Sequence, residues 1–270
     1  LEKLSEGNKL LDMVQKGLSD YLETKRSSFA RFYFLSNDEL LSILSESKDV
    51  KLVQPHLKKC FEGINKVEFE PDLKISALIS REKEQVPTVE PVDPVGKNVE
   101  HWMSELEQCM LASIHDVMKQ AIFDYLVTAR PKWMQSWPGM CVINGSQAHW
   151  TLEMEKGMNE GGNEGLKHEL EKQISQLSDM VVLVRGELEK NARMAIGALT
   201  VIDVHARDVT QRMVDQGVDN PADFLWSSQM RYYWLTEDGP GSEIGADLET
   251  NKEEGALRCQ MVTSRRDYGY

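Results

Sequence analysis

The chain has 270 residues, of which 41% are hydrophobic and 28% are charged, a composition typical of a folded, water-soluble protein. Its 44 acidic residues outnumber its 31 basic residues, so the net charge of -13 disfavours nucleic acid and anionic membranes as partners. No apolar run approaches the roughly 18 to 20 residues that cross a bilayer, and the N-terminus lacks a signal-peptide pattern. We therefore expect an intracellular protein with no nucleic-acid and no membrane partner. Because its first residue is Leu1, we also expect a segment of a longer chain.

The first part of the chain predicts two helices. Apolar residues recur every three or four positions in residues 1–26, which predicts an amphipathic helix that packs on neighbours through Leu4, Leu11, Val14, Leu18, Tyr21 and Leu22. Ser36 and Glu39 have the spacing of a capping box, so a short helix is expected to begin there.

Residues 64–95 have a different pattern, in which apolar and polar residues alternate and Val and Pro become frequent. Two or three short strands are expected, with an edge limited by proline, since proline cannot donate a hydrogen bond to a neighbouring strand. The sequence therefore predicts a small antiparallel β insert in a helical chain.

The longest predicted helix covers residues 98–128 and would be about 45 Å long at 1.5 Å per residue. Pro131 ends it, and Pro138 suits the first turn of the next helix. After the glycine-rich break EGGNEG, helical patterns at 166–184 and 188–213 predict an antiparallel or continuous stack.

The C-terminal part changes in character near residue 229. Asn220 and Pro221 are expected to begin a short helix, and the segments 230–235 and 257–263 read as strands. The acidic segment 236–256 has the composition of a mobile surface loop. The predicted fold is mainly α, an elongated stack of helical bundles with a β insert at about 64–95 and a short β segment at the C-terminal end.

Nucleotide and thiol motifs are absent from the sequence. A phosphate-binding loop requires GxxxxGK[ST], and the nearest stretch, residues 239–241, lacks the Gly-Lys pair. The four cysteines form no CxxC pattern, so buried, reduced thiols are expected at Cys60, Cys109, Cys141 and Cys259.

Two histidines lie near acidic residues in the sequence. His149 and Glu153 could share a helix face and grip a metal, but a third ligand is missing and a solvated or capping histidine is favoured. Asp203 and His205 would lie about 200° apart on a helix, so they cannot converge, whereas His205 and Asp208 would form an ordinary i,i+3 pair. We therefore expect no catalytic, cofactor-binding or metal-binding residue in this chain.

Seven short stretches in a fixed order carry a family resemblance. They are SFARFYFLSNDELL at 28–41, KLVQPHLKKCFEGI at 51–64, GMNEG at 157–161, LVRGEL at 183–188, VIDVHARD at 201–208, QMRYYW at 229–234 and YGY at 268–270. The series resembles the dynein heavy chains, and within them the axonemal members. The first stretch differs from the family at Ala30, where proline is usual. The positions that we call the signature residues are Arg31, Phe32, Tyr33, Phe34, Asn37, Asp38, Asp203, His205, Arg207, Asp208, Arg231, Tyr232, Tyr233 and Trp234.

This resemblance implies a mechanical role. Residues 1–228 would be the C-terminal part of the dynein linker, and residues 229–270 would begin the first, here incomplete, AAA+ module. The linker would change conformation during ATP hydrolysis in the adjoining ring and so produce the power stroke of ciliary or flagellar beating. Residues 64–95 resemble the linker hairpin, so Phe69 and Ile75 are expected to contact the ring. Bending is expected at EGGNEG or at the proline-rich segment 87–94.

The resemblance also implies the surroundings of the chain. The fragment itself would be non-catalytic, with ATP and Mg bound elsewhere in the parent ATPase. Its partners would be the AAA+ ring of the same heavy chain, the microtubule through the stalk, and the intermediate and light chains through the tail. The expected location is the cytoskeleton of the cytoplasm, in the axoneme of a cilium or flagellum.

Two other classes of protein remain open. A non-motor helical scaffold for protein-protein interaction fits the amphipathic patterns equally well, although no repeat of fixed period is found. A self-sufficient nucleoside triphosphatase is disfavoured because the phosphate-binding loop is absent.

Overall fold

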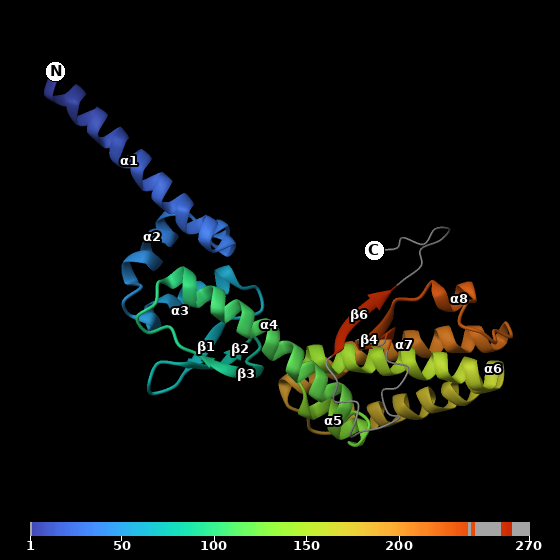
Figure 1. Ribbon diagram of the computed structural model, residues 1–270. Helices are drawn as coiled ribbons and strands as arrows, with labels where there is room; N and C mark the ends of the chain where they lie inside the picture. Colours follow the sequence, from blue (N-terminus) through green and yellow to red (C-terminus); the bar gives the residue numbers. More distant parts are fainter. Residues whose placement is uncertain (1, 237–238, 241–254, 261–270) are drawn as a thin grey trace. The chain divides into compact units, whose positions relative to one another are not determined.

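The structure is a computed structural model that describes residues 2–236, 239–240 and 255–260, with side chains as far as Trp234 (Figure 1). It divides into two compact units, Leu1–Ile114 and His115–Tyr270, and the division falls within helix α4, Val99–Asp124. No helix in the described ranges combines the length and hydropathy needed to cross a membrane. The prediction of a mainly α fold with small β segments is confirmed.

The first unit begins with four helical segments before α4. They are α1 (Glu2–Ser28), the 3-10 helix η1 (Ala30–Phe34), α2 (Asn37–Glu46) and α3 (Val50–Cys60). The predicted capping box is present, because the Glu39 amide donates to Ser36 Oγ over 3.2 Å and the Ser36 amide donates to Glu39 Oε2 over 3.0 Å. Helix α3 was not predicted, since Pro55 lies inside it.

The β insert of the first unit is a three-stranded antiparallel sheet in the order β1-β2-β3. Its strands are β1 (Lys66–Phe69), β2 (Ile75–Ile79) and β3 (Gln85–Val92). The edge strand β3 carries Pro87 and Pro91, in agreement with the predicted proline-limited edge. The sheet turns Val67 and Ile75 into the hydrophobic interior of its unit.

The apolar stripe of α1 is mostly uncovered in the described structure. Leu22 is buried, but Leu4, Leu11 and Val14 are 73%, 67% and 67% exposed. Figure 1 shows the N-terminal turns of α1 without a neighbour in its unit. The helix was predicted correctly, but the prediction that its whole stripe packs on neighbours is wrong for the described residues.

The second unit is built mainly from long helices. After the C-terminal turns of α4 it contains α5 (Arg130–Ser136), α6 (Gly139–Arg185), α7 (Lys190–Asp215), α8 (Phe224–Ser227) and the strands β4 (Arg231–Thr236), β5 (Gly239–Pro240) and β6 (Gly255–Gln260). The strands form a second antiparallel sheet in the order β5-β4-β6.

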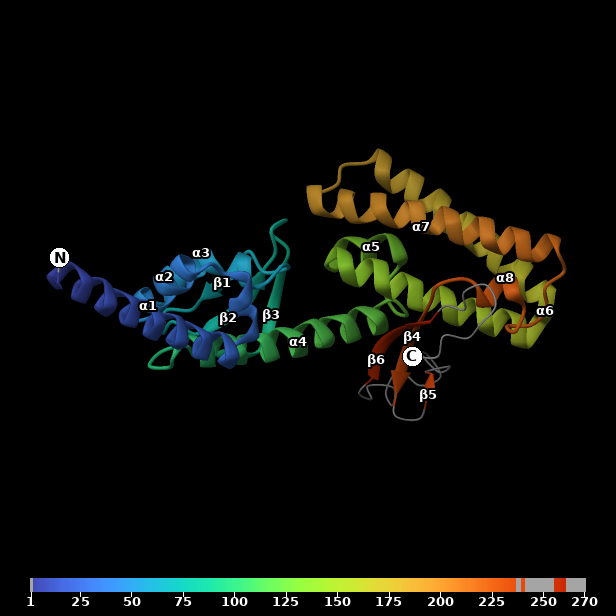
Figure 2. The ribbon, with the colours of Figure 1, turned by 90° about the horizontal axis from the view of Figure 1, so that it is seen from above.

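Helix α6 turns back on itself at Gly162, whose φ of 54° lies in the left-handed region (Figure 2). The two arms run antiparallel, since Lys172 on the second arm pairs with Glu153 on the first at 2.7 Å. They approach closely near the turn, where a Cβ on Gly165 would lie 2.0 Å from the carbonyl oxygen of Gly157. The break predicted at EGGNEG is therefore a tight reversal. The second arm of α6 and helix α7 also run antiparallel, since Asn163 donates to the Val214 carbonyl oxygen and Arg193 donates to the Val184 carbonyl oxygen, so the antiparallel alternative for 166–184 and 188–213 is correct.

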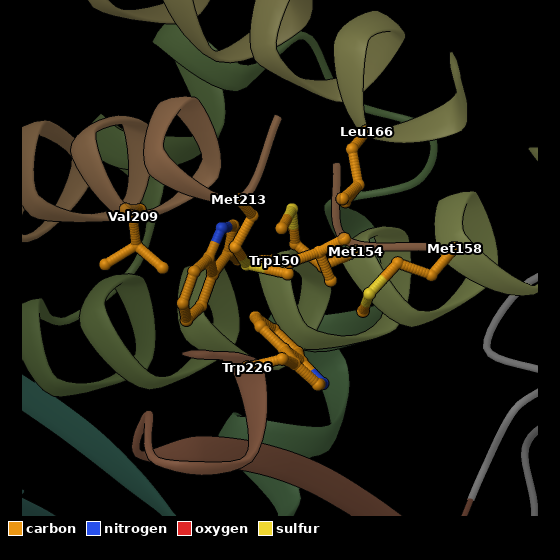
Figure 3. Close-up of a cluster of buried hydrophobic side chains, with 9 residues drawn as sticks. Trp150, Met154, Met158, Leu166, Val209, Met213 and Trp226 are labelled. Carbon is orange, nitrogen blue, oxygen red and sulfur yellow. The ribbon is translucent and has the colours of Figure 1, made fainter. Parts of the chain in front are cut away.

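Tryptophan and methionine side chains fill the interior of the second unit. Trp150 and Trp226 meet edge to face, with ring centroids 5.0 Å apart. Figure 3 shows the cluster around them, which consists of Trp150, Met154, Met158, Leu166, Ala206, Val209, Met213, Val218 and Trp226. A second cluster of the same unit contains Trp133, Met134, Val142, Met180, Ile196 and Leu199. The predicted helical patterns supply part of this interior, through Leu166, Ile196, Leu199, Val209 and Met213, whereas Ile174, Val181 and Val184 of the 166–184 pattern are exposed.

The C-terminal predictions are confirmed in part. The strand expected at 230–235 is β4, and the strand expected at 257–263 is seen as β6 as far as Gln260. The short helix begins at Phe224, where the Asp223 carboxylate accepts from the Leu225 amide. Most of the predicted surface loop 236–256 lies outside the described residues, as does the YGY stretch at 268–270.

Candidate functional site formed by the signature residues

Arg31 joins three elements of the first unit. Its Nε donates to Glu107 Oε1 on α4 over 2.7 Å, and its Nη1 donates to the carbonyl oxygen of Cys60 over 3.2 Å. The guanidinium also lies 5.0 Å from the centroid of the Phe61 ring, within the range of a cation-π contact. With Phe32 fully buried beside it, Arg31 holds η1, α3 and α4 together.

The rest of the N-terminal signature faces outward. Tyr33 and Phe34 are 55% and 72% exposed, and the Tyr33 hydroxyl donates to Glu23 Oε1 over 2.5 Å. Asn37 and Asp38 are exposed in the first turn of α2, where a carboxylate suits the helix dipole. This motif thus combines inward anchors with an exposed aromatic pair.

Asp203 forms a buried ion pair in the second unit. Arg130 Nη2 donates to Asp203 Oδ2 over 2.7 Å and to Ser146 Oγ over 2.8 Å. Burial raises the pKa of the Asp203 carboxyl, and the Arg130 guanidinium opposes that rise. The small pocket that these side chains line with Tyr125 has room for water but not for a nucleotide. Asp203 therefore connects α7 to α5 through this ion pair.

His205 and Asp208 do not form the predicted i,i+3 pair. His205 is exposed, and Asp208 instead accepts from Arg207 at 2.6 Å. The prediction that Asp203 and His205 do not converge is confirmed, since Asp203 points inward to Arg130.

His149 and Glu153 are engaged with different partners. His149 is buried, its Nε2 lies 2.8 Å from the Ile122 carbonyl oxygen, and its ring stacks on Tyr125 with centroids 4.0 Å apart. Burial lowers the pKa of His149 to about 4. Glu153 pairs with Lys172 on the other arm of α6. The expectation of a solvated or capping histidine is therefore wrong for His149, because its ring is buried between Tyr125 and the Ile122 carbonyl oxygen.

Of the expected thiols, Cys60, Cys109 and Cys141 form no disulfide; Cys60 and Cys141 are buried, and Cys109 is half-buried. Burial raises the pKa of the Cys60 thiol to about 12, so this group stays protonated and inert. The side chain of Cys259 lies outside the described residues.

The C-terminal signature residues dock β4 on the first arm of α6. The Tyr233 hydroxyl donates to Glu155 Oε1 over 2.6 Å, and Arg231 Nη1 lies 3.6 Å from the same oxygen. The Tyr232 amide donates to Thr151 Oγ1 over 3.0 Å. Burial, and the hydrogen bond to Glu155, raise the pKa of Tyr233.

Trp234 completes this contact. Its side chain is 2% exposed, and its ring stacks on His115 with centroids 5.5 Å apart. Sequence reasoning found the strand but missed its partners Thr151 and Glu155. Thr151 and Glu155 are four residues apart and so share one helix face, but the same helix carries many other polar residues, and the sequence does not single out this pair.

The two residues proposed for ring contact differ in exposure. Phe69 and Ile75 face each other across β1 and β2, but Ile75 is fully buried while Phe69 is half-buried. Ile75 therefore cannot present a surface, because its side chain forms part of the interior of the sheet. The ring-contact hypothesis rests on Phe69 alone.

Comparisons with known proteins agree with the signature residues. The family model "Dynein heavy chain, N-terminal region 2" matches residues 1–121. The chain is 49% identical over 239 residues to dynein axonemal heavy chain 1 of Mus musculus, and 50% identical over 239 residues to dynein axonemal heavy chain 12 of Rattus norvegicus, in both cases over 88% of this chain. It is 46% identical to dynein axonemal heavy chain 3 of Homo sapiens over 100% of its length. The chain belongs to the dynein heavy-chain family, as a segment of an axonemal dynein heavy chain. It spans 6% to 8% of the length of these three relatives.

Proposed function

We propose that this chain is a mechanical linker element of a dynein motor. Residues 1–228 would form the C-terminal part of the linker, and residues 229–270 would begin the first AAA+ module. One observation supports this role above the others. The strand β4, which belongs to the proposed ring module, is held by side chains of α6, which belongs to the proposed linker.

Long packed helices suit the transmission of force. The antiparallel arms of α6 and the adjacent α7 bury tryptophan and methionine side chains, and closely packed interiors transmit strain without yielding. The hydrolysis of ATP in the ring would supply the energy, and this segment would convert it into movement along a microtubule in a ciliary or flagellar axoneme.

Nucleotide binding is assigned elsewhere in the heavy chain. Within the residues that the structure describes, Gly239 and Pro240 form strand β5 and make no phosphate-binding loop. ATP and Mg would thus be held by other parts of the motor, and intermediate and light chains by its tail.

Energy transfer between two fluorophores tests the proposal in the full-length heavy chain. A donor on a cysteine replacing the exposed Lys16 of α1 and an acceptor in the AAA+ ring should change their transfer efficiency between ADP and ATP with vanadate. A donor and an acceptor that both lie within one ring module serve as the control. Equal efficiency in all nucleotide states would show that this segment does not move relative to the ring.

One observation favours the alternative of a non-motor scaffold, namely the exposed apolar stripe of α1. The same experiment separates the two functions, because a static scaffold has no reason to respond to the nucleotide.

A further inference from the structure

Two side chains of α6 hold β4, and they lie one helical turn apart. Thr151 accepts from the Tyr232 amide, and Glu155 accepts from the Tyr233 hydroxyl. Residues at i and i+4 share a helix face, so the strand is fixed to one stripe of the first arm. Both contacts lie within the second unit.

A single oxygen of Glu155 gathers donors from two elements. Trp226 Nε1 on α8 donates to Glu155 Oε1 over 3.1 Å, and the Tyr233 hydroxyl of β4 donates to it over 2.6 Å. Arg231 Nη1 lies 3.6 Å away and supplies a positive charge. Hydrogen bonds to an ionised carboxylate are shorter and stronger than those between neutral groups. The same oxygen therefore holds the strand and the short helix that leads into it.

Glu155 is better shielded from water than Glu160 on the same arm, since the two side chains are 25% and 68% exposed. The Arg231 side chain that faces it is 9% exposed, and Trp226 is fully buried, so water competes little for these donors. Glu160 on the same arm is a useful contrast, because it is exposed and its partner Lys156 lies 4.0 Å away. Such surface pairs contribute little to stability.

We infer that Glu155 is a latch that carries load between α6 and β4. This inference rests on the proposed function, since it identifies where force would pass from the linker into the first ring module. Glu155 is a positioning residue, which acts through Trp226, Tyr233 and Arg231. When the latch holds, a displacement of α6 moves β4 with it; when the latch is weakened, β4 lifts from the helix face and part of the displacement is lost.

Hydrogen exchange in the full-length heavy chain tests whether Glu155 holds β4 on α6. The Tyr232 amide is bonded to Thr151 Oγ1 and is released only when β4 leaves α6, so its exchange reports the latch directly. Glu155→Gln should speed exchange in the peptide containing Tyr232 about tenfold, because the charge that strengthens these hydrogen bonds is removed. The matched control Glu160→Gln should leave that exchange unchanged.

The ratio of microtubule-gliding velocity to ATP turnover in the same motor tests whether Glu155 transmits force. Glu155→Gln should lower the velocity several-fold while ATP turnover and the melting temperature stay within error of the control. Tyr233→Phe removes only one hydroxyl and should give a smaller fall in the same direction.

Each outcome decides the question. Unchanged exchange at Tyr232 in both variants would overturn the latch. Faster exchange with an unchanged ratio of velocity to turnover would also overturn it, since the contact would then be only structural. The energy-transfer experiment on the unmodified motor judges the linker function separately, so a failed latch leaves that function standing.

Discussion

Arg31 and Arg130 each tie several parts of one unit together through one guanidinium. Arg31 reaches a carboxylate, a backbone carbonyl and an aromatic face, and Arg130 reaches Asp203, Ser146 and the sulfur of Met180. A planar group with five donors can serve several partners at once, which a lysine ammonium cannot do in the same geometry. We therefore expect each arginine to restrain the elements that it joins.

Gly165 is the position where an added methyl group is least tolerable. A Cβ there would lie 2.0 Å from the Gly157 carbonyl oxygen, a backbone atom that cannot move without opening the two arms of α6. We expect Gly165→Ala to lower the free energy of unfolding by about 3 kcal/mol or more. Urea denaturation followed by circular dichroism measures the change.

Gly161 provides the matched control for Gly165. A Cβ at Gly161 would meet no atom within 4 Å. Gly161→Ala should therefore be neutral or stabilise the helix by roughly 0.5 to 1 kcal/mol. Equal stability of the two variants would contradict the close packing of the arms.

His149 should make the stability of the second unit depend on pH. Burial lowers its pKa to about 4 in the folded chain, whereas an unfolded histidine has a pKa of about 6.5. Between these values the unfolded chain binds a proton that the folded chain does not, so stability falls as the pH drops from about 6.5 towards 4. At pH 5 the loss relative to pH 7 is on the order of 2 kcal/mol.

The variant His149→Gln isolates this contribution. Its amide can still donate to the Ile122 carbonyl oxygen but does not titrate. Urea midpoints at pH 7 and pH 5 should differ less in the variant than in the natural chain. The same pH slope in both proteins would show that His149 does not titrate as its burial requires.

The sequence allowed some single residues to be placed, but not others. Val209 and Met213 lie on the helical pattern predicted at 188–213, and both are buried. Glu155 could not be assigned, since a glutamate on a long helix is usually solvated and only the return of β4 shows its partner. Contacts between distant segments leave little trace in local periodicity.

Helix α2 depends on its N-terminal cap. Ser36→Ala removes the hydroxyl that accepts from the Glu39 amide, and this should cost about 1 kcal/mol of stability. Ser45→Ala on the same helix is the control, because the Ser45 hydroxyl only donates to the carbonyl oxygen of Ser42. Thermal unfolding of the two variants checks the difference, and a smaller loss for Ser36→Ala than for Ser45→Ala would count against the cap.

The ion pair between α5 and α7 should show the cost of an unpaired buried charge. Asp203→Asn leaves the Arg130 guanidinium without its carboxylate, and we expect a loss of about 3 kcal/mol. The double variant Arg130→Met with Asp203→Leu should recover most of that loss, since two apolar side chains fill a similar volume. Denaturant titration of both variants provides the test, which fails if the double variant is the less stable.

Helices were predicted at the right place where the sequence carries one clear helical pattern or a capping box. The stripes of α4 and α7 and the capping box of α2 each gave a helix in the right place. Helix α3 was missed because Pro55 is unfavourable in a helix, whereas the buried Val53 and Leu57 outweigh that penalty in the folded unit. For α1, periodicity showed which face is apolar but not what covers it.

The glycine-rich turn of α6 also changes the expected place of bending. Asn163 donates to the carbonyl oxygens of Val214 and Val218, and Gly157 lies against Gly165. Because these contacts hold the turn to α7 and to the opposite arm of α6, we expect it to resist bending. The proline-rich segment 87–94 remains the other predicted place of bending, although Val89 donates its amide to Ser113 Oγ.

The assignment of the whole chain to a linker and the start of a ring module stays a prediction. The compact units divide at Ile114, whereas the resemblance places the functional boundary at residue 228. Since β4 packs on α6, compactness and function need not follow the same boundary here. The axonemal assignment rests on sequence identity to axonemal heavy chains over most of the chain, and not on the pattern of apolar and polar residues.

Contact between the hairpin and the ring is open to a direct test in the full motor. Phe69→Ala should lower gliding velocity relative to ATP turnover if Phe69 touches the ring, and Leu52→Ala, exposed on α3, should not. Ile75→Ser would instead destabilise the sheet, since Ile75 is fully buried. An unchanged ratio of velocity to turnover for Phe69→Ala would exclude this contact.

The closeness of Gly157 and Gly165 has a consequence for inherited variation. Every missense change at the Gly165 codon adds at least a Cβ, and that atom meets the backbone of the opposite arm. Alleles at this position should therefore act by reducing the abundance of the heavy chain, because an unstable chain is degraded before assembly. They would resemble null alleles in dosage.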